Sequence, residues 1–396
     1  MKTLSPNEYK KELPISRIAI IGGGRWARVI AGTLVRILPH NISLSVHSRK
    51  NVSALESWSS LPSLKQRLTI SDEWPELNDM RDCAVIVVNA ARDHADSVRR
   101  ALEAGAPVIV EKPAALTAKE VQSLIDLSIN KNVRFATAHI FMFARYLENF
   151  KNFLLSLGTI HAIRIRMADP GSESRYGDDK KFDQGLPLYA DWIPHAVTIL
   201  NQLTPGKTLS LNDLQFSRGG AHLILCMNCG NSICCVDLER NYKKRERHVE
   251  VELGDGKTYQ LDFSSEPGQI FDGDTWTIGD LKWNHSPRPV ESMLRAFLQW
   301  ISSDIHDPRL DYAVGLLACQ LIDQTRTPYV SAQSAWLTNQ LSKMSDEDSE
   351  SVDYALSELI QASGRLPEVE LMRRINYLRR TYAGSINEAW IWSEYD

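Results

Sequence analysis

The first part of the chain alternates short apolar segments with segments in which apolar residues recur at helical spacing. The apolar segments predict β-strands at residues 17–21, 43–47, 83–89, 107–111 and 134–138. The segments with helical period predict helices at 26–37, 94–104 and 118–130. Short strands that are apolar throughout and alternate with helices are typical of a parallel sheet with helices on both faces. The predicted fold class of this part is therefore α/β.

From about Gly158 the pattern changes to longer segments in which apolar and polar residues alternate. These segments predict strands at 161–167, 221–229, 232–240, 248–253 and 257–263. The Gly254-Asp255-Gly256 turn predicts a hairpin between the last two strands. Two helices, expected at 290–301 and 312–324, would pack on the resulting sheet. This part therefore predicts a second, α+β domain built on a mostly antiparallel open sheet.

The composition fits an ordinary globular protein with more than one domain. The chain has 396 residues, of which 43% are hydrophobic and 24% charged. Its net charge of -4 gives no electrostatic basis for binding nucleic acid or an anionic membrane. No apolar run is long enough to span a bilayer, and the first residues lack the apolar stretch of a secretory signal. We expect a cytoplasmic protein with no nucleic-acid or membrane partner.

Four of the six cysteines lie close together in the sequence, at Cys226, Cys229, Cys234 and Cys235, which raises the question of a metal site. The alternative is a hairpin of residues 223–229 and 232–238 that carries the thiols as small apolar side chains. Adjacent cysteines do not readily share one tetrahedral ion, and a structural zinc site usually needs two separated pairs. The hairpin is favoured, and no metal is expected.

The strand at 17–21 leads into a glycine-rich turn that fits the pattern G-x-G-x-x-A. Gly22 would allow the tight turn, Gly24 would let the backbone approach a pyrophosphate, and Ala27 would let the next helix pack closely. Arg25 and Trp26 lie in the same turn. The helix that follows would direct its N-terminus at the phosphates. The first domain is therefore predicted to be a Rossmann dinucleotide-binding domain.

The end of the second strand bears on the choice between NAD and NADP. An acidic residue there would bind the ribose hydroxyls of NAD and repel a 2′-phosphate. The chain instead has Ser48, Arg49 and Lys50, a hydroxyl followed by two cations, which suits a phosphate dianion. A solvated basic loop is the alternative. NADP is favoured over NAD.

The stretch from His94 to Pro113 carries a more specific resemblance. It contains a histidine, the sequence Ala104-Gly105, an apolar strand and then Glu111-Lys112-Pro113. In this order and spacing the chain resembles the oxidoreductase family of glucose-fructose oxidoreductase, inositol dehydrogenase and rhizopine catabolism, abbreviated Gfo/Idh/MocA. The resemblance implies that Lys112 lies beside the nicotinamide and that the Lys112–Pro113 bond is often cis. Asn89, His94, Glu111, Lys112 and Pro113 are accordingly expected to help form the cofactor site.

The same resemblance implies an Asp and a His four residues apart in the second domain, and Asp191 and His195 fit. A spacing of four places both side chains on one face of a helix. Pro194 requires that this helix begin only just before it, because proline is tolerated in a first turn and not in a helix interior. The alternative is that Asp191 caps the helix and His195 packs beneath the sheet. With Lys112 also present, a catalytic set of Lys112, Asp191 and His195 is favoured.

These residues suit hydride transfer coupled to proton transfer. His195 titrates near neutrality and is the best candidate for the acid or base. Lys112 would polarise the substrate oxygen or share the proton transfer, and Asp191 would orient His195 or hold a neighbouring hydroxyl. We therefore predict an NADP(H)-dependent dehydrogenase or reductase acting on a secondary alcohol or carbonyl of a small-molecule substrate.

The substrate is less well defined by the sequence. Five cations suggest an anionic group on a sugar-like substrate, although a solvated charged loop explains them equally well: Arg164, Arg166, Arg175, Lys180 and Lys181. The apolar segment 139–146 would better suit an aryl or heterocyclic substrate, as in an imine reductase of natural-product, for example siderophore-like, biosynthesis. Sugar chemistry is the first hypothesis and imine reduction the second. A non-catalytic NADP-binding regulator is the third.

Three domains are expected from these patterns. Residues 1–145 would form the Rossmann NADP-binding domain, 146–330 the substrate and oligomerisation domain, and 331–396 a helical C-terminal extension. The extension contains an acidic segment at 345–350 and two expected helices. These helices would span 352–363 and 367–382, ahead of the apolar Trp390-Ile391-Trp392. The resemblance also implies a homodimer or homotetramer.

Overall fold

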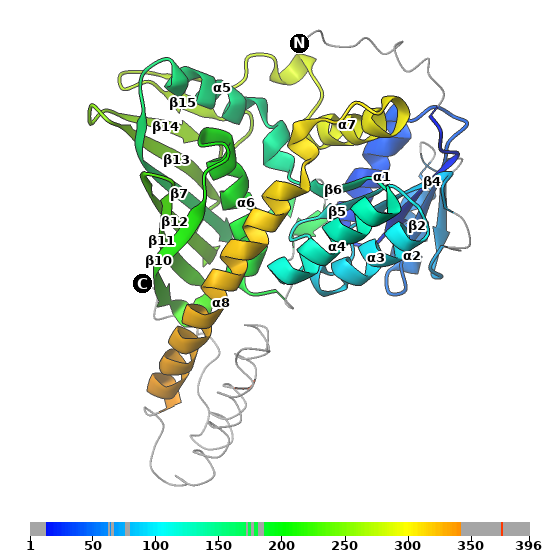
Figure 1. The fold of residues 1–396 in the computed structure, drawn as a ribbon, viewed down its shortest axis with the longest axis horizontal. Coiled ribbons are helices and arrows are strands. Elements are labelled where there is room, and N and C mark those ends of the chain that lie inside the picture. The colour runs from blue at the N-terminus through cyan, green and yellow to red at the C-terminus, as the bar shows by residue number, and fades with distance from the viewer. Residues whose placement is uncertain are drawn as a thin grey trace. The chain divides into compact units, whose positions relative to one another are not determined.

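A computed structural model describes residues 13–341, apart from short gaps, together with residue 374. The gaps are residues 62–63, 65–66, 76–79, 172, 176–177 and 181–185. The chain divides into two compact units, and each runs through two stretches of sequence (Figure 1). Unit 1 comprises Met1–Arg145 and Leu281–Cys319, and unit 2 comprises Tyr146–Asp280 and Gln320–Asp396.

Unit 1 is built on a six-stranded sheet with the order β3-β2-β1-β4-β5-β6, in which every pair of neighbours is parallel. Its strands are β1 Arg17–Ile21, β2 Ser43–His47, β3 Leu68–Ser71, β4 Cys83–Val87, β5 Val108–Glu111 and β6 Phe135–Ala138. Its first helices are α1 Arg25–Ile37, α2 Val52–Ser59, α3 His94–Glu103 and α4 Ala118–Lys131. The predicted α/β class is confirmed. Strand β3 and helix α2 were not predicted, because their short segments lack a clear period.

Helix α7, Pro289–Ser303, lies in unit 1. It was expected to pack on the second sheet. Its buried side chains Met293, Leu294 and Phe297 share one core with Ile30 and Leu34 of α1. That expectation was therefore wrong. An amphipathic pattern shows that a helix buries one face, but it does not show which surface covers that face.

Helix α8, Tyr312–Leu341, begins in unit 1. The ring of Tyr312 stacks on Phe135 of β6, and the Cys319 thiol donates a hydrogen bond to the Ala115 carbonyl. The helix was expected to end at residue 324, and the extension was expected to begin at 331, but α8 continues unbroken past both points. The acidic segment 345–350, the helices expected at 352–363 and 367–382, and residues 390–392 lie outside the described residues, apart from residue 374.

Unit 2 is built on an eight-stranded sheet with the order β10-β11-β12-β7-β13-β14-β15-β16. The strands are β7 Ile160–Pro170, β10 Leu209–Ser217, β11 His222–Cys229, β12 Ser232–Tyr242, β13 Glu246–Leu253, β14 Thr258–Asp262, β15 Gln269–Phe271 and β16 Trp276–Ile278. Only β12 and β7 pair in parallel, so the predicted mostly antiparallel sheet is confirmed. The helices that precede and cover it are α5 Arg145–Leu155 and α6 Leu188–Leu203. A separate pair, β8 Glu173–Arg175 and β9 Asp178–Lys180, completes the unit's strands among the described residues.

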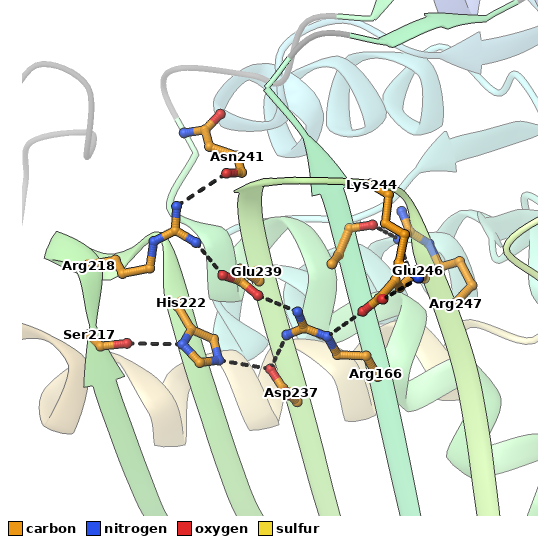
Figure 2. Close-up of polar contacts among 11 residues, drawn as sticks. Arg166, Ser217, Arg218, His222, Asp237, Glu239, Asn241, Lys244, Glu246 and Arg247 are labelled. Carbon is orange, nitrogen blue, oxygen red and sulfur yellow. Dashed lines mark hydrogen bonds and ion pairs between the residues drawn. The ribbon is translucent and has the colours of Figure 1, made fainter. Parts of the chain in front are cut away.

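The two faces of this sheet differ in character. Leu223, Leu225, Val236 and Leu238 are almost completely buried on the face that carries α6, here called the α6 face. The intervening residues form the opposite face, here called the charged face (Figure 2). Its charged residues include Arg164, Arg166, Asp237, Glu239, Glu246, Glu250 and Glu252.

The cysteine-rich hairpin has the geometry expected of it. Strands β11 and β12 pair antiparallel around Gly230-Asn231, and Gly230 has a φ of 57°. Because side chains alternate between faces, Cys229 and Cys234 lie on the α6 face and Cys226 and Cys235 on the charged face. The four thiols therefore do not converge on one point. Within the described part of the chain, no helix is long and apolar enough to cross a bilayer.

Candidate functional site

The glycine turn after β1 has the geometry that a dinucleotide needs. Gly22 has a φ of 132°, and a Cβ there would lie 2.5 Å from the Val88 carbonyl oxygen. Glycine is the residue that fits this position without strain. Gly24 precedes α1 and has open space beside its Cα, while Ala27 is completely buried against the sheet. The backbone N–H groups of the first helical turn are therefore available to a phosphate, because Gly24 has no side chain to cap them.

The loop after β2 lies directly against this turn. The Ser48 hydroxyl would overlap any side chain at Gly23, and the Asn51 side-chain amide donates a 3.2 Å hydrogen bond to the Gly23 carbonyl. Arg49 and Lys50 follow Ser48 and are exposed. The Ser48-Arg49-Lys50 segment therefore lies next to the glycine turn, where the adenosine ribose binds in Rossmann folds.

His47 ends β2 without contributing a charge. Its ring nitrogens lie 2.8 Å from the Glu73 carbonyl oxygen and 2.8 Å from the Ser45 hydroxyl. Burial lowers its pKa, although the hydrogen bond to Glu73 opposes that shift. The imidazole is therefore neutral at neutral pH.

The ends of β4 and β5 are joined by His94. This side chain is 2% exposed, with Nδ1 2.7 Å from the Pro113 carbonyl oxygen and Nε2 3.2 Å from the Asn89 carbonyl oxygen. Because both ring nitrogens face backbone carbonyls, His94 positions the two loops. The Lys112–Pro113 bond is cis.

Asn89 offers a hydrogen-bond acceptor at the same edge of the sheet. Its amide nitrogen donates to the Ser97 hydroxyl at 2.9 Å, while its Oδ1 is buried and accepts no hydrogen bond from the described residues. A buried polar atom is normally satisfied, so this oxygen is suited to a donor on a bound cofactor. Together with the glycine turn, this observation fits a dinucleotide.

Glu111 is held by the first turn of α1. The indole N–H of Trp26 donates to one carboxylate oxygen, and the Lys112 backbone N–H donates to the other at 3.2 Å. Burial raises the pKa of Glu111, although the Trp26 hydrogen bond and the Lys112 charge oppose the shift. Trp26, Glu111 and Lys112 therefore form one contiguous group, and Arg25 begins the helix on which Trp26 lies.

Lys112 lies close enough to His139 to influence it electrostatically. His139 follows β6 and is 3% exposed. Burial first, and repulsion by the Lys112 ammonium second, lower the pKa of His139 to about 4. His139 is therefore neutral near pH 7 and adds no second positive charge beside Lys112. His139 was not predicted as a site residue, although its place directly after the predicted strand 134–138 was a usable signal.

Asp191 and His195 lie on α6, one turn apart. Nearly every other residue of this helix is buried, whereas these two are partly exposed. The helix begins at Leu188, six residues before Pro194, so the expectation that it would begin only just before the proline was wrong. The burial of Ile193, Val197 and Leu200 stabilises the helix in spite of the proline, because tertiary packing outweighs local propensity.

A buried arginine that the sequence analysis did not identify holds Asp191. Arg240 of β12 is 3% exposed and donates a 3.0 Å hydrogen bond to Oδ2 of Asp191. The same guanidinium donates to the Leu186 carbonyl oxygen at 3.2 Å, just before α6 begins. The Trp192 indole N–H adds a third contact, to the same Oδ2 at 3.1 Å. Alternation along the predicted strand 232–240 places Arg240 on the apolar face, which was the signal available in the sequence.

A second buried arginine supports the same end of the helix. The Arg247 guanidinium lies 4.7 Å from the centre of the Trp192 ring. It also donates to Asp169 at 2.5 Å and to the Ala168 carbonyl at 2.7 Å. The Arg247 charge is therefore paired with Asp169, and the guanidinium packs on the ring of Trp192, a residue of α6.

Two of the cations suggested for the substrate lie elsewhere. Arg164 pairs with Glu250 at 2.6 Å on the charged face. On the same face Arg166 pairs with Asp237, Glu239 and Glu246 (Figure 2). Asp191 is held from the other face of the sheet, so these arginines do not line a pocket with it. Lys181 and the side chains of Arg175 and Lys180 lie outside the described residues.

The predicted site residues therefore fall into two groups. Gly22, Gly24, Ser48, Asn89 and Lys112 lie at the carboxyl edge of the parallel sheet or in the turns beside it. Asp191 and His195 share one partly exposed strip of α6 in unit 2. The first group can bind a dinucleotide, and the second can transfer a proton.

Comparison with known families agrees with the first group. Residues 16–139 match the model of the Gfo/Idh/MocA oxidoreductase family, NAD-binding Rossmann fold. The similarity to the Gfo/Idh/MocA oxidoreductases therefore covers all six strands of the parallel sheet. The resemblance stated from residues 94–113 is confirmed, and so is the expectation of an oxidoreductase that binds a nicotinamide dinucleotide. No curated protein matches the chain significantly.

Solved structures share the wider fold. KijD10, a 3-ketoreductase from Actinomadura kijaniata solved with TDP-benzene and NADP, is 17% identical with a TM-score of 0.64. The match covers 79% of this chain and 97% of KijD10. GnnA, a UDP-N-acetylglucosamine 3-dehydrogenase from Acidithiobacillus ferrooxidans, is 16% identical with a TM-score of 0.59, over 78% of this chain and 96% of GnnA. At these identities the likeness establishes the fold.

Proposed function

We propose that the protein is an NADP(H)-dependent oxidoreductase that transfers hydride between the nicotinamide and a secondary alcohol or carbonyl carbon of a sugar-like substrate. The observation that carries the proposal is the Gfo/Idh/MocA dinucleotide-binding domain with Lys112 at the end of β5. The partly exposed Asp191 and His195 supply the proton-transfer groups that such a reaction requires.

The cofactor would be held at the carboxyl edge of the parallel sheet. The glycine turn and the N-terminus of α1 would bind the pyrophosphate, and the Asn89 Oδ1 would accept a hydrogen bond from a ribose hydroxyl or an amide of the cofactor. Ser48, Arg49 and Lys50 favour NADP over NAD, because a hydroxyl and two exposed cations suit a 2′-phosphate. When bound, the nicotinamide accepts or donates the hydride.

The residues of this chain would manage the proton and the developing charge. Lys112, beside the neutral His139, stabilises negative charge on the substrate oxygen. His195 takes the hydroxyl proton in oxidation and returns it in reduction. Asp191, fixed by Arg240 and Trp192, orients the acid-base group or a substrate hydroxyl. Arg240 and Trp192 act as positioning residues.

A nucleotide-linked sugar is the first substrate class to test. KijD10 and GnnA, which share the fold, are described as a 3-ketoreductase and a sugar-nucleotide 3-dehydrogenase. The decisive experiment follows NADPH absorbance with purified full-length protein and a panel of 3-keto sugars, nucleotide sugars and cyclic imines. Lys112→Ala is expected to lower turnover about 10²- to 10³-fold. Lys131→Ala, an exposed lysine on α4, is the matched control and should retain full turnover.

Each outcome of this assay distinguishes among the functions considered. Turnover of an imine but no sugar would transfer the proposal to imine reduction. Tight NADPH binding with no turnover of any class, and with a biological role unaffected by Lys112→Ala, would instead identify a regulator. Full turnover by the Lys112→Ala variant would disprove the assigned role of Lys112.

The cofactor preference has its own test. The Kd values for NADPH and NADH would be measured by titration of nicotinamide fluorescence. Arg49→Ala and Lys50→Ala should each weaken NADPH about tenfold by removing a charge-assisted contact, and leave NADH unchanged. Equal effects on the two cofactors would contradict the assignment of NADP. The expected homodimer or homotetramer stays a prediction, to be checked by light scattering.

A further inference from the structure

The first turn of α1 is joined to the end of β5 by one pair of side chains. Trp26 is the second residue of α1, and Glu111 is the last residue of β5. The indole N–H of Trp26 donates a hydrogen bond to Oε1 of Glu111, and the backbone N–H of Lys112 donates one to Oε2 at 3.2 Å. The Glu111 carboxylate therefore connects the helix that would bind the pyrophosphate with Lys112.

These two side chains cross a gap that is too wide for a backbone contact. Strand β4 lies between β1 and β5 in the parallel sheet, so the ends of β1 and β5 are two strand spacings apart. Two spacings amount to about 10 Å, which is beyond the reach of any direct hydrogen bond between the two backbones. A long donor on α1 and a long acceptor on β5 are needed, and Trp26 and Glu111 supply them.

Neither the nucleotide-binding pattern nor packing accounts for a tryptophan at this position. Trp26 occupies a position of G-x-G-x-x-A to which the pattern assigns no residue type. Its side chain packs against the core of unit 1, as that of Trp58 on α2 also does. A phenylalanine would fill most of that space, but it has no N–H to donate. The hydrogen bond to Glu111 is therefore what distinguishes Trp26 from another large apolar residue.

We propose that Trp26 and Glu111 are positioning residues that hold Lys112 at a fixed place relative to the glycine turn, and so relative to the bound cofactor. The inference deepens the proposed function and rests on it, because Lys112 needs this placement only if it acts on a substrate beside the nicotinamide. It gives the two residues a role other than the direct cofactor contact that the sequence predicted.

The charge on Glu111 depends on the same contacts. Burial raises the pKa of Glu111, whereas the Trp26 hydrogen bond, the Lys112 charge and the Lys112 backbone hydrogen bond lower it. Without the indole donor, the carboxylate loses one of the bonds that fix it, and hydrogen bonds to an ionised acceptor are the stronger ones. Lys112 is the next residue in the chain, so it gains freedom with Glu111. A misplacement of about 1 Å can lower turnover about 100-fold.

The first test removes the donor and keeps the packing. In the purified full-length protein, Trp26→Phe should lower kcat about tenfold through the displacement of Lys112. The KM for the substrate and the Kd for NADPH should change by less than about twofold, because the binding contacts remain. Trp58→Phe is the matched control, since it loses the same indole from the same core, and it should keep the kcat of the wild type. Thermal melting would check that both variants fold.

The second test follows the placement of Lys112 without any turnover. The Lys112 charge is, after burial, the second cause that lowers the pKa of His139. If Lys112 moves away, NMR titration should show a higher pKa for His139 in Trp26→Phe, in the direction expected for Lys112→Ala. Trp58→Phe should titrate like the wild type.

The third test asks whether the two residues act as one link. Glu111→Gln keeps the shape of the side chain, removes its charge and turns one acceptor oxygen into a donor. The double variant Trp26→Phe/Glu111→Gln should therefore have the kcat of Glu111→Gln alone, within about twofold, because the link can be broken only once. Losses of kcat that multiply in the double variant would show two independent roles.

Three results would overturn the proposal. One is a Trp26→Phe variant with the kcat and the His139 titration of the wild type. The second is weaker NADPH binding by Trp26→Phe with an unchanged His139 titration, which would make Trp26 a direct cofactor contact. The third is the multiplied loss in the double variant. If the wild type turns over no substrate but Trp26→Phe still raises the pKa of His139, the proposed hydride transfer fails and the link between α1 and Lys112 stands.

Discussion

Two candidate catalytic regions of this molecule control charge in opposite ways. In unit 1, Lys112 lies near a histidine that burial keeps neutral, and its neighbour Glu111 is bonded by an indole. In unit 2, Asp191 is paired with a buried arginine, Arg240, which also donates to a backbone carbonyl. In unit 1, the neutral His139 adds no positive charge beside Lys112. In unit 2, Arg240 supplies a positive charge beside the Asp191 carboxylate.

The difference shows what each unit can position from its own elements. The carboxyl edge of a parallel sheet brings strand ends together, so groups from β4, β5 and β6 meet without long side chains. Helix α6 lies on a sheet face, and the long side chain of Arg240 reaches from β12 to its first turn. The two arrangements predict different sensitivities to mutation and to pH.

The largest effect is expected from removing the charge beneath Asp191. Arg240→Gln leaves a carboxylate and a carbonyl without their buried donor, which should cost about 3 kcal/mol of unfolding free energy. It should also lower kcat more than it raises KM, because the orientation of Asp191 is lost. Urea unfolding and steady-state kinetics would measure both.

Arg240→Lys provides the control for charge. It keeps the cation and loses the second hydrogen bond, so its stability and kcat should fall between those of the wild type and Arg240→Gln. If the glutamine variant were as stable as the wild type, the comparison between the two regions would not hold.

The next effect concerns pH and unit 1. Because the pKa of His139 is about 4 when folded and about 6.5 when unfolded, the unfolded chain binds a proton first as the pH falls. The free energy of unfolding should therefore decrease between about pH 6.5 and pH 4, by about 3 kcal/mol in total. His139→Gln should remove this part of the slope in urea unfolding measured across that range.

Lys112→Ala tests whether Lys112 contributes to the low pKa of His139. Removing the ammonium takes away one of the two causes that depress the His139 pKa, so NMR titration should show a higher pKa for this histidine than in the wild type. An unchanged His139 titration would mean that Lys112 does not act on it.

The smallest effect is expected on the charged face. Arg164 is 55% exposed in its pair with Glu250, and exposed ion pairs contribute about 0–1 kcal/mol. Arg164→Gln should therefore change the unfolding free energy by less than Arg240→Gln does, and leave turnover unchanged. A loss as large as that of Arg240→Gln would show that the two faces of the sheet are not distinct in the way proposed.

The sequence predicted much of the fold because local patterns carry it. The period of apolar residues identified all but one of the strands of the parallel sheet, and the glycine turn marked the dinucleotide-binding domain. The placement of α7 was not predictable, because its apolar face fits any complementary surface. The start of α6 was mispredicted because Pro194 is tolerated once the helix is buried.

The candidate site also contains residues that the sequence predicted and residues that only the tertiary structure identified. Residue type and spacing predicted Gly22 and Gly24, and the family resemblance added Lys112, Asp191 and His195 as proposed site residues. Only the tertiary structure identified Arg240 and His139, and only it showed that Arg166 serves an ion network on the other face of the sheet. The physical reason is that motifs record which groups a chain needs. Burial and long-range contact decide which of those groups are charged and where they are held.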